Sequence, residues 1–222
     1  MSVKDNLLAI KRQLPQGVEL VAVSKFHPAE VVKQAYDAGQ RIFGENRAQE
    51  LAVKAPQLPS DICWHFIGHL QTNKVRQVVK HATIIESVDS VRLLQLINKE
   101  ALRIGRVIDV LLQLHVAQEE AKSGFAVEEL LSAFTLGELS GFDNVRIRGL
   151  MAMASLTEDQ NQIDREFSIV ENTFNIVKEE FFADNDAFNQ ISMGMSDDWP
   201  IAVKHGSTLV RIGTAIFGQR EY

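Results

Sequence analysis

The sequence has little or nothing of several features that mark large protein classes. Cys63 is the one cysteine among 222 residues, so the chain cannot form an internal disulfide or a cysteine cluster for zinc. No stretch approaches the ~18 apolar residues that indicate a membrane-spanning helix. The amphipathic pattern over residues 3–13 is interrupted by charge and lacks the apolar core of a signal peptide. These absences predict a soluble protein of a reducing compartment, which we expect to be the cytoplasm.

An excess of positive charge and the common nucleotide signatures are also missing. The formal net charge of −6 argues against a surface built for nucleic acid or for an acidic membrane. Basic residues gather in "NKVRQVVKH" (73–81), but their helical spacing is typical of a solvated helix face. Neither G-x-x-x-x-G-K-[ST] nor G-x-G-x-x-G occurs. We therefore expect no nucleic-acid partner and no membrane partner.

The sequence does have eight short apolar runs that alternate with helical patterns. The runs that predict strands are 18–24, 41–44, 63–68, 82–87, 107–116, 144–151, 188–193 and 208–213. Eight strands separated by helices indicate an α/β protein with a closed (β/α)8 TIM barrel. An open doubly wound sheet would explain the alternation but gives no reason for eight strands. No stretch reads as a linker, so we expect one domain over residues 1–222, with an extra helix at its N-terminus.

Two cationic side chains are predicted at the ends of barrel strands. Val21, Val23 and Lys25 alternate, so in an extended chain they share one face. Arg211 alternates with Leu209 in the same way and points into the barrel if Leu209 does. An inward arginine is costly unless a carboxylate, a phosphate or a ring nitrogen lies nearby. Among the carboxylates near strand ends, those of residues 45 and 86 (Glu45 and Glu86) are candidate partners.

The loops after the last two strands are suited to a phosphate, which β/α barrels often bind at that place. Ser192 and Ser196 offer hydroxyls, and Gly213 beside Thr214 lets backbone N–H groups approach an anion closely. A lysine in a partly desolvated barrel mouth can have a lowered pKa, and its neutral amine can then attack a carbonyl. Together with Lys25, this pattern indicates a phosphorylated aldehyde held as a Schiff base, and pyridoxal 5′-phosphate (PLP) fits it.

By these residues the sequence resembles the pyridoxal phosphate homeostasis protein family, which is related to the N-terminal barrel of alanine racemase, a fold type III PLP enzyme. The resemblance spans almost the whole chain, and its last motif is long and specific. The stretches that carry it are "VAVSK" (21–25), "IFGENRAQE" (42–50), "WHFIGHLQTNK" (64–74), "GLMAM" (149–153) and "SMGMSDDWPIAVKHGSTLVRIGTAIFG" (192–218).

The resemblance implies roles for individual residues. Lys25 would carry the cofactor and Arg211 would approach the cofactor's ring nitrogen. Asn46, just past the second predicted strand, is a candidate ring-side contact. The family's phosphate site corresponds to four residues here: Ser192, Ser196, Gly213 and Thr214.

The same family is regarded as a carrier and regulator of PLP without an assigned reaction. An arginine that faces the pyridine nitrogen keeps it unprotonated, which makes the ring a poorer electron sink. Racemisation also needs a second base, which alanine racemases take from a further β domain, whereas this sequence ends at Tyr222. We therefore expect a monomeric PLP-binding homeostasis protein with little or no turnover, which passes PLP transiently to PLP-dependent apoenzymes or buffers the free aldehyde. The alternatives are a fold type III amino-acid racemase or decarboxylase, and a barrel enzyme that binds a sugar phosphate without PLP.

Two further pairs of residues have simple structural interpretations. His65 and His69 are four residues apart, a spacing that metal ligands can use, but no third candidate ligand stands near them. We expect structural histidines and no metal. Asp197 and Asp198 precede Trp199 and Pro200, a pattern that predicts a helix N-cap rather than a catalytic pair.

Overall fold

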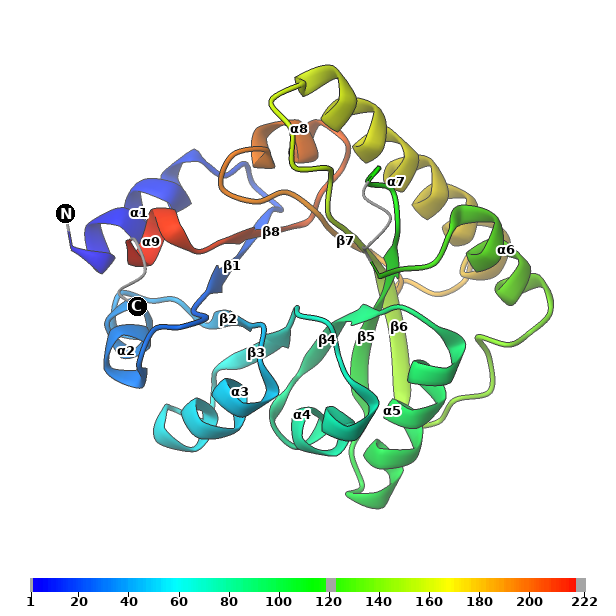
Figure 1. Cartoon of the computed structure of the whole chain (residues 1–222), viewed down its shortest axis with the longest axis horizontal. Coiled ribbons are helices and arrows are strands. Elements are labelled where there is room, and N and C mark those ends of the chain that lie inside the picture. Colours follow the sequence, from blue (N-terminus) through cyan, green and yellow to red (C-terminus); the bar gives the residue numbers. More distant parts are fainter. Residues whose placement is uncertain (1, 119–122, 219–222) are drawn as a thin grey trace.

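The eight predicted strands form a closed parallel barrel. The computed structural model describes residues 2–118 and 123–218, and within them the strands follow one another around the barrel in chain order (Figure 1). The strands are β1 (Glu19–Val23), β2 (Ile42–Glu45), β3 (Cys63–Phe66), β4 (Ile84–Val88), β5 (Ile108–Leu114), β6 (Val145–Ala152), β7 (Gln190–Ser192) and β8 (Leu209–Ile212). The first strand pairs with the last, with Val21 opposite Arg211. This closure confirms the barrel and excludes the open sheet.

The helices surround the barrel on the outside (Figure 1). In the described residues they are α1 (Val3–Gln13), α2 (Ala29–Asp37), α3 (Ala48–Lys54), α4 (Val75–His81), α5 (Val91–Arg103), α6 (Val127–Thr135), α7 (Gln160–Phe181), α8 (Trp199–Lys204) and α9 (Thr214–Phe217). Two short 3₁₀ helices, η1 (Ala55–Gln57) and η2 (Thr72–Lys74), adjoin α3 and α4. Helices between the strands and an extra helix at the N-terminus were predicted, whereas α9, which follows β8, was not.

Strand periodicity divides the buried side chains into two sets, because successive residues of a strand point to opposite faces. The larger set packs between the strands and the helices. A smaller set fills the middle of the barrel and comprises Val21, Ile84, Leu111, Met151 and Leu209. Since Leu209 belongs to the inner set, Arg211 also faces inward, as the alternation predicted.

A polar layer lies above this apolar layer, toward the carboxyl ends of the strands. On β4 and β8, Glu86 and Arg211 come two residues after the inner apolar positions, and His65 and Ser192 stand on β3 and β7. All four side chains are buried. The barrel interior is therefore apolar at its middle and ionic just below its mouth.

The first and last helices of the described residues, α1 and α9, meet on the outside of the barrel. Helix α1 begins with a capping box, in which Ser2 and Asp5 bond each other's side chain and backbone. Its Asn6 side chain donates a hydrogen bond of 3.1 Å to the Ile216 carbonyl of α9. Figure 1 shows α1 and α9 side by side. The extra N-terminal helix is thus present, and it covers the short helix that follows β8.

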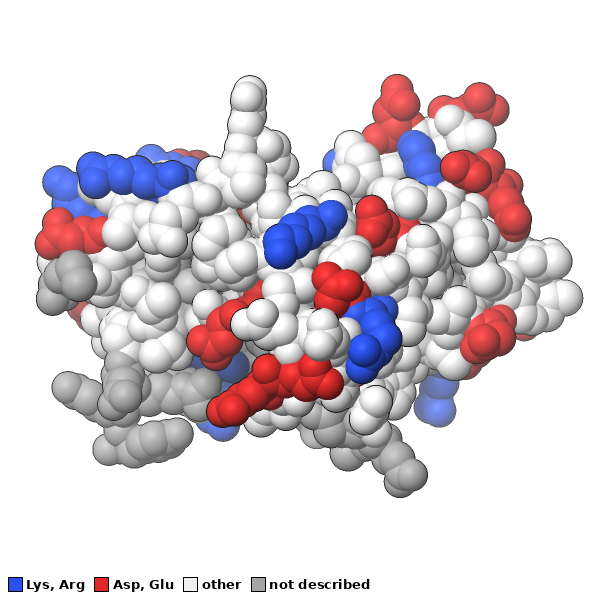
Figure 2. All heavy atoms as spheres, turned by 90° about the horizontal axis from the view of Figure 1, so that it is seen from above, with Lys and Arg blue, Asp and Glu red and all other residues white. Residues whose placement is uncertain are grey.

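The surface agrees with the modest net charge. Figure 2 views the molecule from the side where α7 and α8 lie, and acidic and basic side chains are intermixed there. Over the described residues, no helix has both the length and the apolar composition that crossing a bilayer requires.

Candidate functional site

A cavity of about 540 Å³ lies at the carboxyl end of the barrel. Its walls come mainly from the segments after β1, β2, β3, β6, β7 and β8, which are far apart in the sequence. A neighbouring cavity of about 750 Å³ shares Met153, Met195 and Asp197 with it. Six of the seven residues predicted for a cofactor site line the first cavity: Lys25, Asn46, Ser196, Arg211, Gly213 and Thr214.

Lys25 stands two residues beyond the end of β1 and is half-buried. Val23, on the same face of the chain, also lines the cavity. Phe26 follows with φ = +68°, a left-handed conformation that is uncommon for a residue other than glycine. The chain therefore turns sharply just after Lys25.

Two hydrogen bonds to residues outside the cavity lining hold the Arg211 guanidinium. It donates to the Ser192 hydroxyl at 2.6 Å and to the Ala152 carbonyl at 2.8 Å. A guanidinium has five N–H donors in a fixed plane, so these bonds fix its orientation while it still forms part of the cavity wall. Burial lowers the pKa of Arg211, although Glu86 and Asp198 act in the opposite direction.

A buried carboxylate balances this charge. Glu86 accepts a hydrogen bond of 2.6 Å from the Ser192 hydroxyl and one of 2.5 Å from Nδ1 of His65, and its Oε2 lies 3.8 Å from Arg211. Burial raises the pKa of Glu86, but its contacts with His65, Arg211 and Ser192 outweigh burial and hold that pKa below its usual range. Of the two carboxylates considered as partners of Arg211, Glu86 is the one beside it.

Burial alone would lower the pKa of His65. Its hydrogen bonds with Cys63 and Glu86 outweigh burial and raise the pKa of His65 to about 9. His65 and Arg211 thus share one carboxylate, and of these three groups Arg211 is the one that lines the cavity. His65 is a structural histidine, as predicted. Across the described part of the chain, no group of three or more potential metal ligands occurs.

Ser192 is the seventh predicted residue, and it lies behind the cavity wall. Its hydroxyl donates to Glu86 and accepts from Arg211, and its side chain is fully buried. Ser196 lines the cavity instead. Asp198 occupies the N-cap position of α8, as predicted, but its carboxylate accepts from the Met195 backbone N–H and makes no cap bond. That bond fixes the turn that carries Ser196.

Two features of the cavity wall suit a ligand: a position where only glycine fits, and a buried acceptor without a hydrogen-bond donor among the described residues. At Gly213, a Cβ atom would lie 3.0 Å from the Val23 carbonyl oxygen and 3.3 Å from Val23 Cβ, so a side chain there would crowd β1. The amide oxygen of Asn46 is buried and has no hydrogen-bond partner among the described residues. Such an atom costs free energy unless something donates to it.

Sequence reasoning missed an ionic cluster beside the site. Lys54 of α3 is buried and contacts Glu45 at 2.7 Å and Glu50 at 3.0 Å. Glu45 had been considered as a partner of Arg211. The alternation of side chains along a strand argues against that pairing. Ile42 faces the inner core, so Glu45, three residues later, faces the helices. The Glu50–Lys54 spacing of four residues was a second signal.

Comparisons with known proteins identify the family of the chain. The family model for the alanine racemase N-terminal domain matches residues 1–221. A pyridoxal phosphate homeostasis protein of Haemophilus influenzae is 36% identical over 100% of this chain and 98% of its own length. One from Escherichia coli is 37% identical over 94% of this chain and 88% of its own length.

Solved structures show the same fold. PipY of Synechococcus elongatus, with PLP bound, is 38% identical, with a TM-score of 0.89 over 98% of this chain and 100% of that one. An alanine racemase of Clostridium difficile matches 100% of this chain and 57% of its own with a TM-score of 0.73, and at 16% identity this likeness shows the fold only. The chain therefore belongs to the alanine racemase N-terminal domain family and, within it, to the pyridoxal phosphate homeostasis proteins.

Proposed function

We propose that this chain binds pyridoxal 5′-phosphate in the cavity at the barrel mouth and serves in intracellular PLP homeostasis. The observation that carries the proposal is that an amine, a guanidinium and a Gly-Thr pair from opposite ends of the sequence line one cavity. The names of the relatives and the PLP-bound structure of PipY support the ligand's identity.

The residues present fit this cofactor. Bound PLP would supply an aldehyde, and a neutral lysine amine can condense with it to a Schiff base with release of one water. We assign that amine to Lys25, which reaches the cavity from the end of β1. Gly213, Thr214 and Ser196 offer backbone N–H groups and hydroxyls for the phosphate. Asn46, whose buried amide oxygen has no hydrogen-bond donor among the described residues, is assigned to contact the side of the PLP ring.

Arg211 would face the ring nitrogen, and its surroundings favour weak catalysis. Ser192 and the Ala152 carbonyl hold the guanidinium in place, and Glu86 compensates its charge. A guanidinium stays charged at any ordinary pH and donates hydrogen bonds only. It therefore leaves a pyridine nitrogen unprotonated and limits the ring as an electron sink. In this proposal Ser192 positions Arg211 and Ser196 serves the phosphate.

The first test is the substitution Lys25→Ala. We expect the purified protein to show the visible absorbance of a conjugated C=N bond when PLP is added, and Lys25→Ala to lose it while the fold persists. Borohydride reduction followed by peptide mapping should place the label on Lys25. Lys204→Ala, an exposed position on α8, is the matched control and should leave the absorbance unchanged. A label on another lysine would contradict the assignment.

A second experiment separates a carrier from an enzyme. The PLP-loaded protein is incubated with L-amino acids, and exchange of the α-proton with solvent is followed. We expect exchange far slower than a dedicated racemase would give. Fast exchange would instead favour a fold type III racemase or decarboxylase.

Further properties remain predictions of the sequence. We infer a cytoplasmic monomer in which residues 1–222 form one domain and which passes PLP transiently to apoenzymes. Light scattering after size-exclusion chromatography tests the monomer. Mixing the loaded protein with a PLP-dependent apoenzyme, and comparing the rate of activation with that by free PLP, tests the transfer.

A further inference from the structure

The cluster formed by Glu45, Glu50 and Lys54, which we call the Lys54 cluster, lies against the loop that carries Lys25. The Lys54 side chain reaches in from α3 and is almost fully buried. Its ammonium donates to the Ser24 carbonyl at 2.8 Å, to Glu45 Oε1 at 2.7 Å and to Glu50 Oε2 at 3.0 Å. An ammonium has three donors, and these three contacts use all of them.

The cluster fixes the residue that precedes Lys25. The Ser24 hydroxyl donates a hydrogen bond of 2.6 Å to Glu45, and the Ser24 carbonyl accepts the one from Lys54. The Ser24 backbone N–H also donates to the Gly44 carbonyl at 2.9 Å. Backbone and side chain of Ser24 are therefore both held, and the residue is fully buried.

The cluster also fixes the residue that follows Lys25. The Phe26 backbone N–H donates a hydrogen bond of 2.7 Å to Glu50. The Arg47 guanidinium lies 4.5 Å from the Phe26 ring centroid and 4.0 Å from the Glu50 carboxylate. The left-handed backbone of Phe26 costs on the order of 1 kcal/mol and persists only where its surroundings hold it.

Stability does not account for this arrangement. The Glu45 side chain is fully buried, and its Oε2 has no hydrogen-bond partner among the described residues. Buried ion pairs seldom repay the cost of desolvating both charges, and apolar replacements are often as stable. Burial also raises the pKa of Glu45, and Lys54 and Ser24 offset this only in part. Two contacts of the cluster, from Lys54 to the Ser24 carbonyl and from the Phe26 N–H to Glu50, are made with the backbone on either side of Lys25.

We propose that the Lys54 cluster is a positioning device for Lys25. By holding residues 24 and 26, it directs the Lys25 amine into the cavity and sets how readily that amine combines with an aldehyde. Glu45, Glu50 and Lys54 are positioning residues, because the described residues that line the cavity do not include them. This inference rests on the proposed function, which gives Lys25 its covalent role.

The test compares two ligands on one variant. Pyridoxamine 5′-phosphate has the ring and the phosphate of PLP but an amine in place of the aldehyde, so it cannot combine with lysine. In Lys54→Met, which keeps a long side chain, we expect the affinity for PLP and the rate of the absorbance change to fall about ten- to a hundredfold, since misplacing a reacting group by about 1 Å has such effects. Binding of pyridoxamine 5′-phosphate should stay within about twofold of wild type.

Glu50→Ala is a second variant in case Lys54→Met folds poorly, because Glu50 is only partly buried. It removes the acceptor of the Phe26 N–H and should show the same selective loss of PLP. Glu50→Gln keeps a side-chain oxygen for that N–H and should retain more of the affinity. In the ligand-free protein, hydrogen exchange at the Phe26 amide should be faster in Glu50→Ala than in Glu50→Gln.

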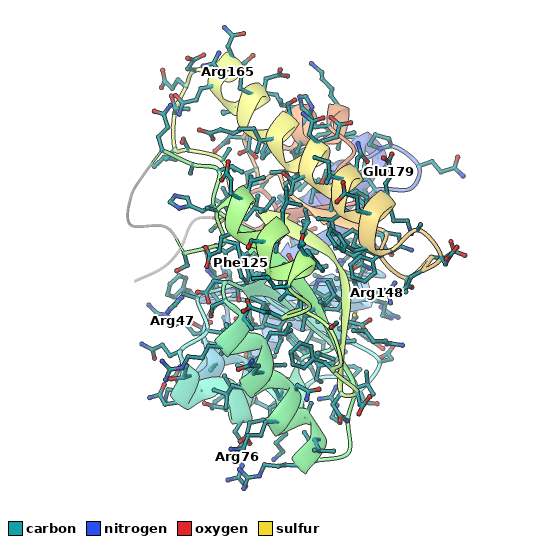
Figure 3. The ribbon with its side chains drawn as sticks, turned by 90° about the vertical axis from the view of Figure 1, so that its right-hand side faces the viewer. Arg47, Arg76, Phe125, Arg148, Arg165 and Glu179 are labelled. Atoms are coloured by element: carbon teal, nitrogen blue, oxygen red, sulfur yellow. The ribbon has the colours of Figure 1, made fainter. Side chains whose placement is uncertain are left out.

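Asp109→Asn is the matched control. It disrupts ion pairs with Arg146 and Arg148 at the opposite end of the barrel. In Figure 3, Arg47 beside the Lys54 cluster and Arg148 lie on opposite sides of the view. Neither ligand's affinity should change.

The outcomes separate the two proposals. Equal losses for both ligands in Lys54→Met and Glu50→Ala would show a merely structural cluster, and unchanged PLP binding would also overturn the inference while leaving the proposed function intact. If the wild-type protein forms no bond to PLP at Lys25, the proposed function fails and the inference fails with it.

Discussion

The two ends of the barrel use ionic groups in opposite ways. At the mouth, Lys54 and Glu45 are 7% and 0% exposed, and His65 and Glu86 are 1% and 0% exposed. At the base, Asp109 on β5 pairs with Arg146, whose side chain is 60% exposed. The mouth has ion pairs with both partners buried in the protein interior, whereas the pairs of Asp109 at the base leave their arginines partly in water.

This difference indicates that the buried ion pairs at the mouth serve the cavity, since they contribute little to stability. Exposed pairs contribute about 0 to 1 kcal/mol and cost little to form. Buried pairs lose the hydration of both partners. Removing one partner leaves the other as an uncompensated charge in the protein interior, which destabilises the folded state. We therefore expect the mouth to be sensitive to loss of a single charge and the base to be tolerant.

The largest expected effect is that of Glu86→Gln. The substitution keeps the size of the side chain but leaves Arg211 and His65 without their shared carboxylate. We expect the free energy of unfolding of the ligand-free protein to fall by about 3 to 5 kcal/mol, since an uncompensated buried charge costs that much. Urea unfolding followed by circular dichroism measures it. A loss below about 1 kcal/mol would show that the two ends do not differ.

An effect of intermediate size is expected from pH. In the folded protein the pKa of His65 is raised to about 9, whereas an unperturbed histidine has a pKa of about 6.5. The folded state then binds the extra proton between these values, so this contribution to stability is complete below about pH 6.5 and is lost as the pH rises through about 9. We expect it to be on the order of 1 to 3 kcal/mol.

The measurement is the free energy of unfolding across that pH range in wild type and in His65→Gln. The wild-type curve should fall more steeply than the variant's. Parallel curves would mean that His65 is not the group that binds the proton. His205, which bridges Asp164 and Glu171 on α7, also has a raised pKa, and His205→Ala serves as the control for that second contribution.

The smallest effect is expected at the base. Asp109→Asn removes the charge that Arg146 and Arg148 share, but both arginines reach solvent or other acceptors. We expect the free energy of unfolding to fall by about 1 kcal/mol or less. Thermal unfolding at low and high salt checks this, since screening should shrink the difference. A loss as large as that of Glu86→Gln would remove the contrast between the two ends.

Much of the fold could be predicted because strand and helix periodicities are local. The apolar run at 107–116 is buried along the whole of β5, and the alternation of Leu209 and Arg211 gave the inward direction of the arginine. Helix α9 escaped prediction because four residues are too few to show a helical period. The grouping of Lys25 with Gly213 in one cavity follows from barrel closure and the family motifs together.

What could not be predicted depends on which side chains meet across the barrel. Ser192 and Ser196 look equivalent in the sequence, but one lies behind Arg211 and the other lines the cavity. Just past the end of a strand, the direction of a side chain is set by a turn. The two-residue alternation of the strand no longer predicts it there. The contact of Lys54 with Ser24 joins a helix to a loop thirty positions earlier, and only the folded chain reveals it.

The pairing of β1 with β8 and of α1 with α9 has a consequence for synthesis on the ribosome. Asn6 and Ile216 are 210 positions apart and yet are hydrogen-bonded, and the segment that carries Lys25 shares a cavity with Gly213. The nascent chain therefore lacks the β8 partner of its first strand and the α9 partner of its first helix until translation is almost finished. The complete cavity can form only after the residues that follow β8 have left the exit tunnel, because Gly213 and Thr214 are part of its wall.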